Sequence, residues 1–238
     1  MIKLNMPSSN NKKMTTNIRA AILGVNDGLI SNFSLMMGFA GGTAITGNPE
    51  YILLAGFAGL LAGSLSMGAG EYVSMKAQVD SYEYQIKKET VKLRLCPEKE
   101  AEKLKLIYMK KGLQEDLATQ TVQEIFNNPD AAIDTMSKEK LGLNPDNLGS
   151  PVKASITSIL AFSCGAFVPI IPFMFTTGNI AIIESASLSI VFLMIVGGAS
   201  AINTGMPFFK GSLRMLMFGT FAAVITYISG TLIGVGLL

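Results

Sequence analysis

The sequence has no histidine and only two cysteines among its 238 residues. Cys96 lies in a charged region and Cys164 in an apolar run, on different sides of a predicted membrane boundary, so a disulfide framework is excluded. A Cys/His zinc site is excluded as well, because such a site takes its ligands from these two residue types. Both cysteines are interpreted as small packing residues.

Charge is also scarce, since only 15% of the residues are charged while 49% are hydrophobic. With a mean hydropathy of +0.42, the chain is too apolar for an ordinary soluble domain of its length. A membrane-spanning helix needs about 20 apolar residues, and helices satisfy their own backbone hydrogen bonds in lipid. The sequence therefore predicts an all-α polytopic membrane protein with five transmembrane helices, near 18–40, 52–75, 154–175, 185–203 and 213–237.

Lysine and arginine are distributed unevenly between the connections. Thirteen of the nineteen lie in 76–153, and none lies in 41–51 or 176–184. The positive-inside rule therefore places the N-terminus and the long connection in the cytosol. The basic arm at 1–17 is expected to meet anionic lipid headgroups, and the first apolar run is too long for a signal-peptide core.

The connection at 76–151 is predicted to form a small helical lobe between transmembrane regions 18–75 and 152–238. The second membrane helix is expected to continue to about Leu95, and Pro97 and Gly112 are typical of a helix start and a helix stop. Two further helices are predicted at 113–126 and 129–141, before a linker rich in Gly, Asn and Pro. The small core predicts contact with a second copy, and thirteen acids against thirteen bases in 76–153 argue against nucleic-acid binding.

Asp27 lies about nine residues into the first apolar run, which a rise of about 1.5 Å per residue converts to about 13 Å below the membrane surface. This depth is close to the middle of a hydrocarbon core about 30 Å thick. A carboxylate there is costly unless it meets water, a partner or a cation, so Asp27 is a candidate functional residue.

Met67, Glu71 and Met75 follow at four-residue spacing and share one face of the second predicted membrane helix. Together with Asp27 they predict a transport pathway that leads inward from the cytosolic side. Carboxylate is a hard ligand and thioether a soft one, and the combination favours a first-row divalent ion such as Fe²⁺ or Mn²⁺. Packing is the alternative role for Met67, because the chain has fourteen methionines.

Small residues and prolines interrupt several of the apolar runs. The pairs Gly59/Gly63 and Gly230/Gly234 allow close helix contact, either within the chain or across a dimer interface. Pro169 and Pro172 predict a kink in the third membrane helix, either beside a cavity or simply packed.

Two sequence stretches resemble the first two membrane spans of the vacuolar iron transporter family: residues 19–31, containing Asn-Asp-Gly-Leu-Ile-Ser, and residues 63–74, containing Ser-Met-Gly-Ala-Gly-Glu-Tyr. Further agreement is found at 111–113, 141–143 and 169–172. The resemblance implies a dimeric five-span carrier that exchanges cytosolic Fe²⁺ or Mn²⁺ for protons, with a cytosolic lobe that collects metal on glutamates. The resemblance implies that the metal is the transported substrate and that no separate cofactor is needed.

By position, Asp27 and Met67 match the metal-handling residues of that family. Ala20 and Gly59 stand where plant and fungal members carry further acids, and the resemblance suggests that Glu71 takes over part of their role. This variant is similar to many bacterial members, which implies a plasma membrane and export of metal from the cytosol.

The lobe departs further from the family pattern, with Lys92, Lys103, Leu106 and Lys140 where relatives commonly carry glutamate. A protonated lysine cannot bind a divalent cation, so metal binding by several sites is in question. Acids remain in or near the family positions at Glu89, Glu98, Glu100, Glu102 and Glu139. Of these, Glu98, Glu102 and Glu139 are the candidate metal ligands, and a solvated helix face balanced by lysines is the alternative.

The leading hypothesis is a proton-coupled transporter of Fe²⁺ or Mn²⁺. The alternatives are a non-transporting membrane protein, such as a metal-sensing or assembly factor with a degenerate lobe, and a carrier for another substrate. Enzymatic activity is not predicted, because the sequence has no nucleophile with its base, phosphate loop or hydrolase metal motif.

Overall fold

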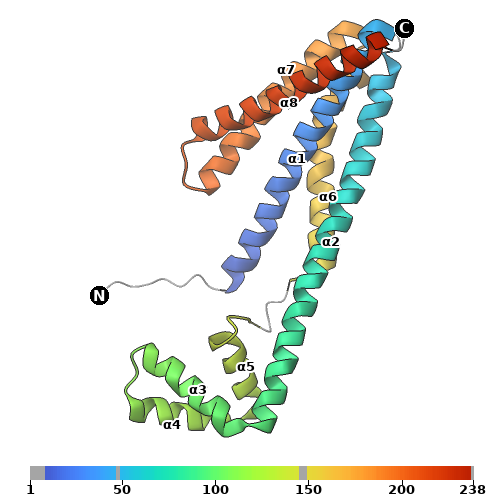
Figure 1. Ribbon diagram of the computed structural model, residues 1–238. Coiled ribbons are helices and arrows are strands. Elements are labelled where there is room, and N and C mark those ends of the chain that lie inside the picture. The colour runs from blue at the N-terminus through green and yellow to red at the C-terminus, as the bar shows by residue number, and fades with distance from the viewer. Residues whose placement is uncertain (1–8, 47–48, 145–148, 237–238) are drawn as a thin grey trace. The chain divides into compact units, whose positions relative to one another are not determined.

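The computed structural model describes residues 9–46, 49–144 and 149–236, and over these ranges the chain is helical and contains no strand. This confirms the all-α prediction. The described residues form two compact units, the first within 1–72 and 152–238 and the second within 73–151. The elements, labelled in Figure 1, are α1 (Ser9–Thr46), α2 (Glu50–Leu95), α3 (Pro97–Lys110), α4 (Glu115–Phe126), α5 (Pro129–Glu139), α6 (Pro151–Phe167), the 3₁₀ helix η2 (Val168–Met174), α7 (Gly178–Asn203) and α8 (Phe208–Gly236).

Four helical segments among the described residues are long and apolar enough to cross a membrane: Glu50–Leu95, Pro151–Met174, Gly178–Ile202 and Phe208–Val235. Four of the five predicted spans are therefore supported. The fifth, α1, has 38 residues, which is long enough to cross a membrane, but carries Asn26, Asp27 and Asn32 in its middle, which lower its hydropathy. α1 also begins at Ser9 rather than at Ile18, because no helix-breaking residue separates the polar arm from the apolar run.

Glycines bring α1 and α8 into close contact in the first unit. A Cβ added at Gly230 would collide with the carbonyl of Gly38, and one added at Gly234 would lie 2.9 Å from the carbonyl oxygen of Gly42. The Thr226 hydroxyl of α8 also donates a hydrogen bond to the carbonyl of Ser34, at 2.7 Å. Gly230 and Gly234 therefore serve packing within the chain.

The two prolines of the third predicted span change the helix type, as expected of a kink. The α-helical ladder of α6 ends at Phe167, and the following turn is 3₁₀ with buried proline rings. The Ser185 hydroxyl of α7 donates to the Pro169 carbonyl at 2.7 Å, and the Thr176 hydroxyl donates to the Pro172 carbonyl at 2.9 Å. The kink is thus packed and its carbonyls are satisfied, which favours the packing alternative over a cavity.

The second unit contains the end of α2 together with α3, α4 and α5. Its core is formed by Leu93, Leu104, Val122 and Met136, one from each helix. Pro97 starts α3 as predicted, and Gly112 follows the helix end with a φ of 99° that favours glycine. The predicted helices at 113–126 and 129–141 are confirmed with ends that differ by two residues.

Candidate functional site

Asp27 lies on an exposed face of α1. Leu23, Ser31 and Leu35, at four-residue spacing from it, are exposed as well. The Ser31 hydroxyl donates a hydrogen bond to the main-chain carbonyl of Asp27 at 2.5 Å, which leaves the Asp27 carboxylate uninvolved in that contact. No ion pair among the described residues includes Asp27. The chain therefore presents this carboxylate outward instead of burying it.

Two glycines fix the direction in which Asp27 points. A Cβ at Gly28 would collide with the Phe162 carbonyl of α6, and a Cβ at Gly165 of α6 would collide with the Val25 carbonyl of α1. The contact is therefore reciprocal and leaves room for a side chain on neither helix. Because successive helix residues are about 100° apart, the α1 face that holds Gly28 against α6 turns Asp27 away from it.

The same helix α6 also contacts α2 and so relates the depths of Asp27 and Met67. Gly63 of α2 faces the Phe162 ring, and Gly68 faces Ile159 and Ser155. The Ser155 hydroxyl confirms the second contact by donating to the Gly68 carbonyl at 2.8 Å. These contacts allow depth to be expressed by residue number along α6. Asp27 lies at about the level of residue 163 of α6 and Met67 at about the level of residue 158, so the two are separated along the helix axis by about 7 Å. Met67 is half-buried and lies toward the N-terminal end of α6.

Asn32 occupies the place next to Gly59. Its side-chain amide is 2% exposed and donates to the Ala166 carbonyl at 2.6 Å, while its Oδ1 has no hydrogen-bond partner. A Cβ at Gly59 would lie 2.6 Å from this oxygen and 2.5 Å from a methyl group of Leu35. Asn32 and Leu35 thus fill the space that an acidic side chain at 59 would need. The side chain of Ala20, the second such position, lies outside the described side chains.

The other predicted pathway residues are divided between the two units. Glu71 is half-buried on α2, one turn from Met67, and belongs to the first unit. Met75 belongs to the second unit, where its sulfur would lie 2.8 Å from a Cβ added at Gly149. Met75 therefore packs on the backbone of the linker that precedes α6.

The candidate metal ligands of the second unit are not brought together. Glu139 pairs with Lys111, Glu102 lies 4.0 Å from Lys105, and Glu98 is exposed. Throughout the described part of the chain, no three side chains of Asp, Glu, Cys or His are grouped closely enough to hold a metal ion. This arrangement fits the alternative of a solvated acidic face.

Sequence reasoning missed the two acids that are buried. Glu89 of α2 and Glu100 of α3 are each 2% exposed, and the ammonium of Lys140 contacts both. Burial alone would raise the pKa of Glu100, but hydrogen bonds from Lys103 and Lys140 lower it to about 2. A sequence signal did exist, because Glu89 and Glu100 each lie one helical turn before a core leucine, Leu93 and Leu104.

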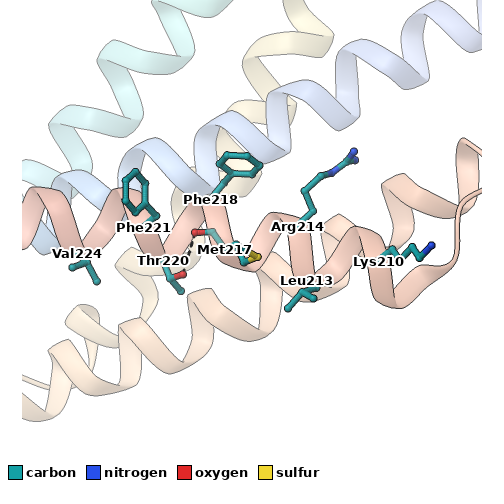
Figure 2. A pocket seen from close by; sticks show the side chains of 8 residues that line it. All are labelled: Lys210, Leu213, Arg214, Met217, Phe218, Thr220, Phe221 and Val224. Atoms are coloured by element: carbon teal, nitrogen blue, oxygen red, sulfur yellow. Dashed lines mark hydrogen bonds between the residues drawn. The ribbon is translucent and has the colours of Figure 1, made fainter.

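Two grooves open on the surface of the first unit, and neither is lined by Asp27 or Met67. One of about 630 Å³ lies between α1 and α8 and includes Leu35, Phe39 and Tyr51. The other, of about 750 Å³, follows α8 from a basic end to an apolar end (Figure 2). Its lining residues are Lys210, Leu213, Arg214, Met217, Phe218, Thr220, Phe221 and Val224.

Comparison with known proteins places this arrangement in a family. The model of the VIT family matches residues 18–231, which include both membrane motifs and the second unit. The chain belongs to the VIT family. It is 30% identical to vacuolar iron transporter 1 of Eucalyptus grandis over 211 residues, covering 88% of this chain and 84% of that relative.

Two further VIT-family relatives show similar agreement. Vacuolar iron transporter 1 of Oryza sativa subsp. japonica is 30% identical over 88% of this chain and 82% of its own length. Vacuolar iron transporter homolog 3 of Arabidopsis thaliana is 34% identical over 91% and 83%. The family is one of transporters and not of enzymes, and the apolar helices of this member identify a multi-pass integral membrane protein.

Proposed function

We propose that this VIT-family protein moves a divalent transition metal, Fe²⁺ or Mn²⁺, out of the cytosol, with Asp27 and Met67 as ligands on the pathway. The observation that carries the proposal is the outward-facing Asp27 carboxylate in the middle of a long, largely apolar helix. Such an acid is costly in a membrane unless it meets water or a cation. The names of the relatives, which are iron transporters, support the choice of cargo.

The ligand set supports a first-row metal over an alkali or alkaline-earth ion. Asp27 offers hard oxygen ligands and Met67 a soft sulfur ligand, and a pathway that uses both in turn suits Fe²⁺ or Mn²⁺ better than Ca²⁺. Their separation of about 7 Å along the axis is that of successive binding steps, with Met67 first for an ion that enters from the N-terminal end of α6. Glu71, one turn nearer that end of α6 than Met67, would extend the same path at its entrance.

We propose that α1 is the fifth span and that a second copy of the chain covers its Asp27 face. Leu23, Asp27, Ser31 and Leu35 form a continuous exposed stripe on this helix. In a lone protomer that stripe would place a carboxylate in hydrocarbon, whereas a paired stripe from a second copy would enclose a polar path. Exposed apolar side chains of the second unit, such as Tyr84 and Leu95, support the same homodimer.

Proton coupling follows from competition for one carboxylate. Asp27 must be ionised to bind a metal cation, so a proton that reaches it from the far side of the membrane displaces the metal. An inward proton gradient would thereby drive export. The relatives' names refer to the vacuole, whereas the motif variant predicts a plasma membrane, and both locations place the metal source in the cytosol.

We propose an anionic phospholipid as the occupant of the groove on α8. Lys210 and Arg214 form its charged end, and Arg214, Phe218 and Phe221 project from the same side of the helix (Figure 2). From Arg214 to Val224 the helix rises about 15 Å, which is half of a hydrocarbon core about 30 Å thick. The groove therefore fits a headgroup at the membrane surface and an acyl chain that ends near the midplane.

Transport in proteoliposomes tests the main proposal. Uptake of Fe²⁺ and Mn²⁺ should require a pH gradient and should fall at least about tenfold in Asp27→Asn, because the neutral amide cannot compensate a divalent charge. Met67→Leu, which keeps the volume but removes the sulfur, should lose uptake, whereas a packing role would leave it unchanged. Asp80→Asn, an exposed acid paired with Lys76, is the matched control. Full uptake by Asp27→Asn would refute the role of Asp27 on the pathway, and absence of uptake by the wild type would favour a non-transporting protein.

A further inference from the structure

The second unit contains a closed network of charges on its core. Glu89 and Glu100 are the only charged side chains among its described residues that are buried, and three lysines surround them. Lys92 lies 3.3 Å from one Glu89 oxygen, and Lys140 contacts the other. Lys103 lies 2.5 Å from one Glu100 oxygen, and Lys140 lies 2.6 Å from the other. Each of the four carboxylate oxygens therefore has one ammonium partner.

Lys140 differs from the other two lysines because it connects helices that are distant in the sequence. Lys92 and Lys103 each pair with an acid three residues earlier on the same helix. Lys140, the residue that ends α5, joins Glu89 of α2 to Glu100 of α3. Glu89, Glu100 and Lys140 are each one turn from a residue of the hydrophobic core, so the bridge lies directly over that core.

Placing two buried carboxylates from different helices close together is energetically unfavourable unless a cation lies between them. In carboxylate sites that role belongs to a metal ion, which neutralises both acids and holds their helices together. Here the ammonium of Lys140 lies within hydrogen-bond distance of both acids. Although burial lowers the pKa of Lys140, its hydrogen bonds to Glu100 and Glu89 raise it overall, so the bridge keeps its charge at neutral pH.

We propose that Lys140 is the built-in cation of the second unit: its ammonium occupies the position between Glu89 and Glu100 that a divalent metal would otherwise fill. The unit is therefore assembled without metal and does not respond to metal. Replacing Lys140 by a neutral residue turns the Glu89–Glu100 pair into a divalent-cation site. This inference concerns the second unit alone and does not depend on transport through the first.

Hydrogen exchange of the full-length protein in detergent tests the proposal, with α3 and α5 as the reporting segments. In the wild type, protection of these helices should be the same in EDTA and in MnCl₂. In Lys140→Met, which keeps the length of the side chain, exchange should speed up by about tenfold or more in EDTA, because two buried acids lose their shared partner. Adding MnCl₂ should restore most of that protection.

Three further variants control the test. Lys138→Met removes an exposed ion pair with Asp134 on the same helix and should behave as the wild type. Lys140→Arg should stay protected without metal. Combining Lys140→Met with Glu89→Gln and Glu100→Gln removes the charges together, so protection should recover in EDTA and should not respond to Mn²⁺.

The proposal is overturned by any of four results. The first is wild-type protection that falls in EDTA or rises with Mn²⁺, since the unit would then still use metal. The second is unchanged exchange in Lys140→Met, and the third is exchange in that variant that Mn²⁺ does not slow. A Mn²⁺ response in the neutral triple variant would likewise show that the carboxylates are not the site.

Discussion

Acid should destabilise the second unit through Glu100, by an amount that the structure predicts. Hydrogen bonds from Lys103 and Lys140 lower the pKa of this carboxyl from 4.5 to about 2 in the folded state. A group with a lowered pKa stabilises the fold at pH values above its unfolded pKa and loses that contribution as the pH falls toward its folded pKa. A shift of this size corresponds to about 3 kcal/mol at neutral pH, and about 2 kcal/mol of that is lost by pH 3.

The assay can be made specific for the second unit because the chain has no tryptophan. Phe126→Trp would place a single fluorophore at the edge of the second unit's core. Urea unfolding of this variant in detergent, followed by its fluorescence, should show the unfolding free energy falling by about 2 kcal/mol between pH 6 and pH 3. Adding Glu100→Gln should remove most of that fall, because the amide does not titrate.

The control for this experiment is Asp134→Asn, an acid in an exposed ion pair with Lys138, which should leave the pH profile unchanged. The reasoning is refuted if Glu100→Gln retains the full loss of stability on acidification. In that case the acid response would come from other carboxylates, and the buried network would contribute nothing specific.

Two further predictions concern the first unit. Gly28→Ala should lower the unfolding free energy of the detergent-solubilised protein by about 1–3 kcal/mol, measured as a lower melting temperature, because the added Cβ meets the Phe162 carbonyl. Gly70→Ala, which has nothing within 4 Å of the added Cβ, should be neutral or stabilising. Equal effects of the two substitutions would contradict the packing of α1 on α6. Lys210→Gln combined with Arg214→Gln should reduce binding of phosphatidylglycerol, measured by native mass spectrometry in mixed-lipid nanodiscs, relative to an exposed-lysine control, Lys88→Gln. Unchanged binding would remove the proposed lipid from the α8 groove.

The helices were predictable from the sequence because apolar runs, prolines and glycines mark them directly. Pro97, Gly112 and Pro129 define the ends of the helices of the second unit almost to the residue. The ends of α1 were less predictable, because the helix continues on both sides of its apolar run. Gly41, near the C-terminal end of α1, does not end the helix, because it packs on the Tyr227 carbonyl of α8. This is a contact between distant parts of the chain, so the sequence pattern around Gly41 does not reveal it.

The buried acids of the second unit were not predictable by the same means. Composition and spacing drew attention to Glu98, Glu102 and Glu139, which lie in acidic stretches but face solvent or local lysines. Glu89 and Glu100 are distinguished by Lys140, which follows them by 51 and 40 residues. Only the fold brings Lys140 to these two acids. A position-by-position comparison with the family therefore shows only that Lys140 replaces a glutamate, whereas the structure shows that it bridges Glu89 and Glu100.

The two units treat their acids in opposite ways, and this contrast constrains the mechanism. In the second unit the buried carboxylates are fully occupied by ammonium groups, so they have no oxygen left for an incoming ion. In the first unit Asp27 is exposed and forms no ion pair among the described residues, on a helix face fixed by Gly28. If the proposed pathway holds, a metal that crosses the membrane helices would meet carboxylates outside any ion pair of the described residues at Glu71 and Asp27, on either side of Met67. On the proposed function, selectivity would then reside in the membrane helices, and charge changes in the second unit should alter its stability without altering which metal is carried.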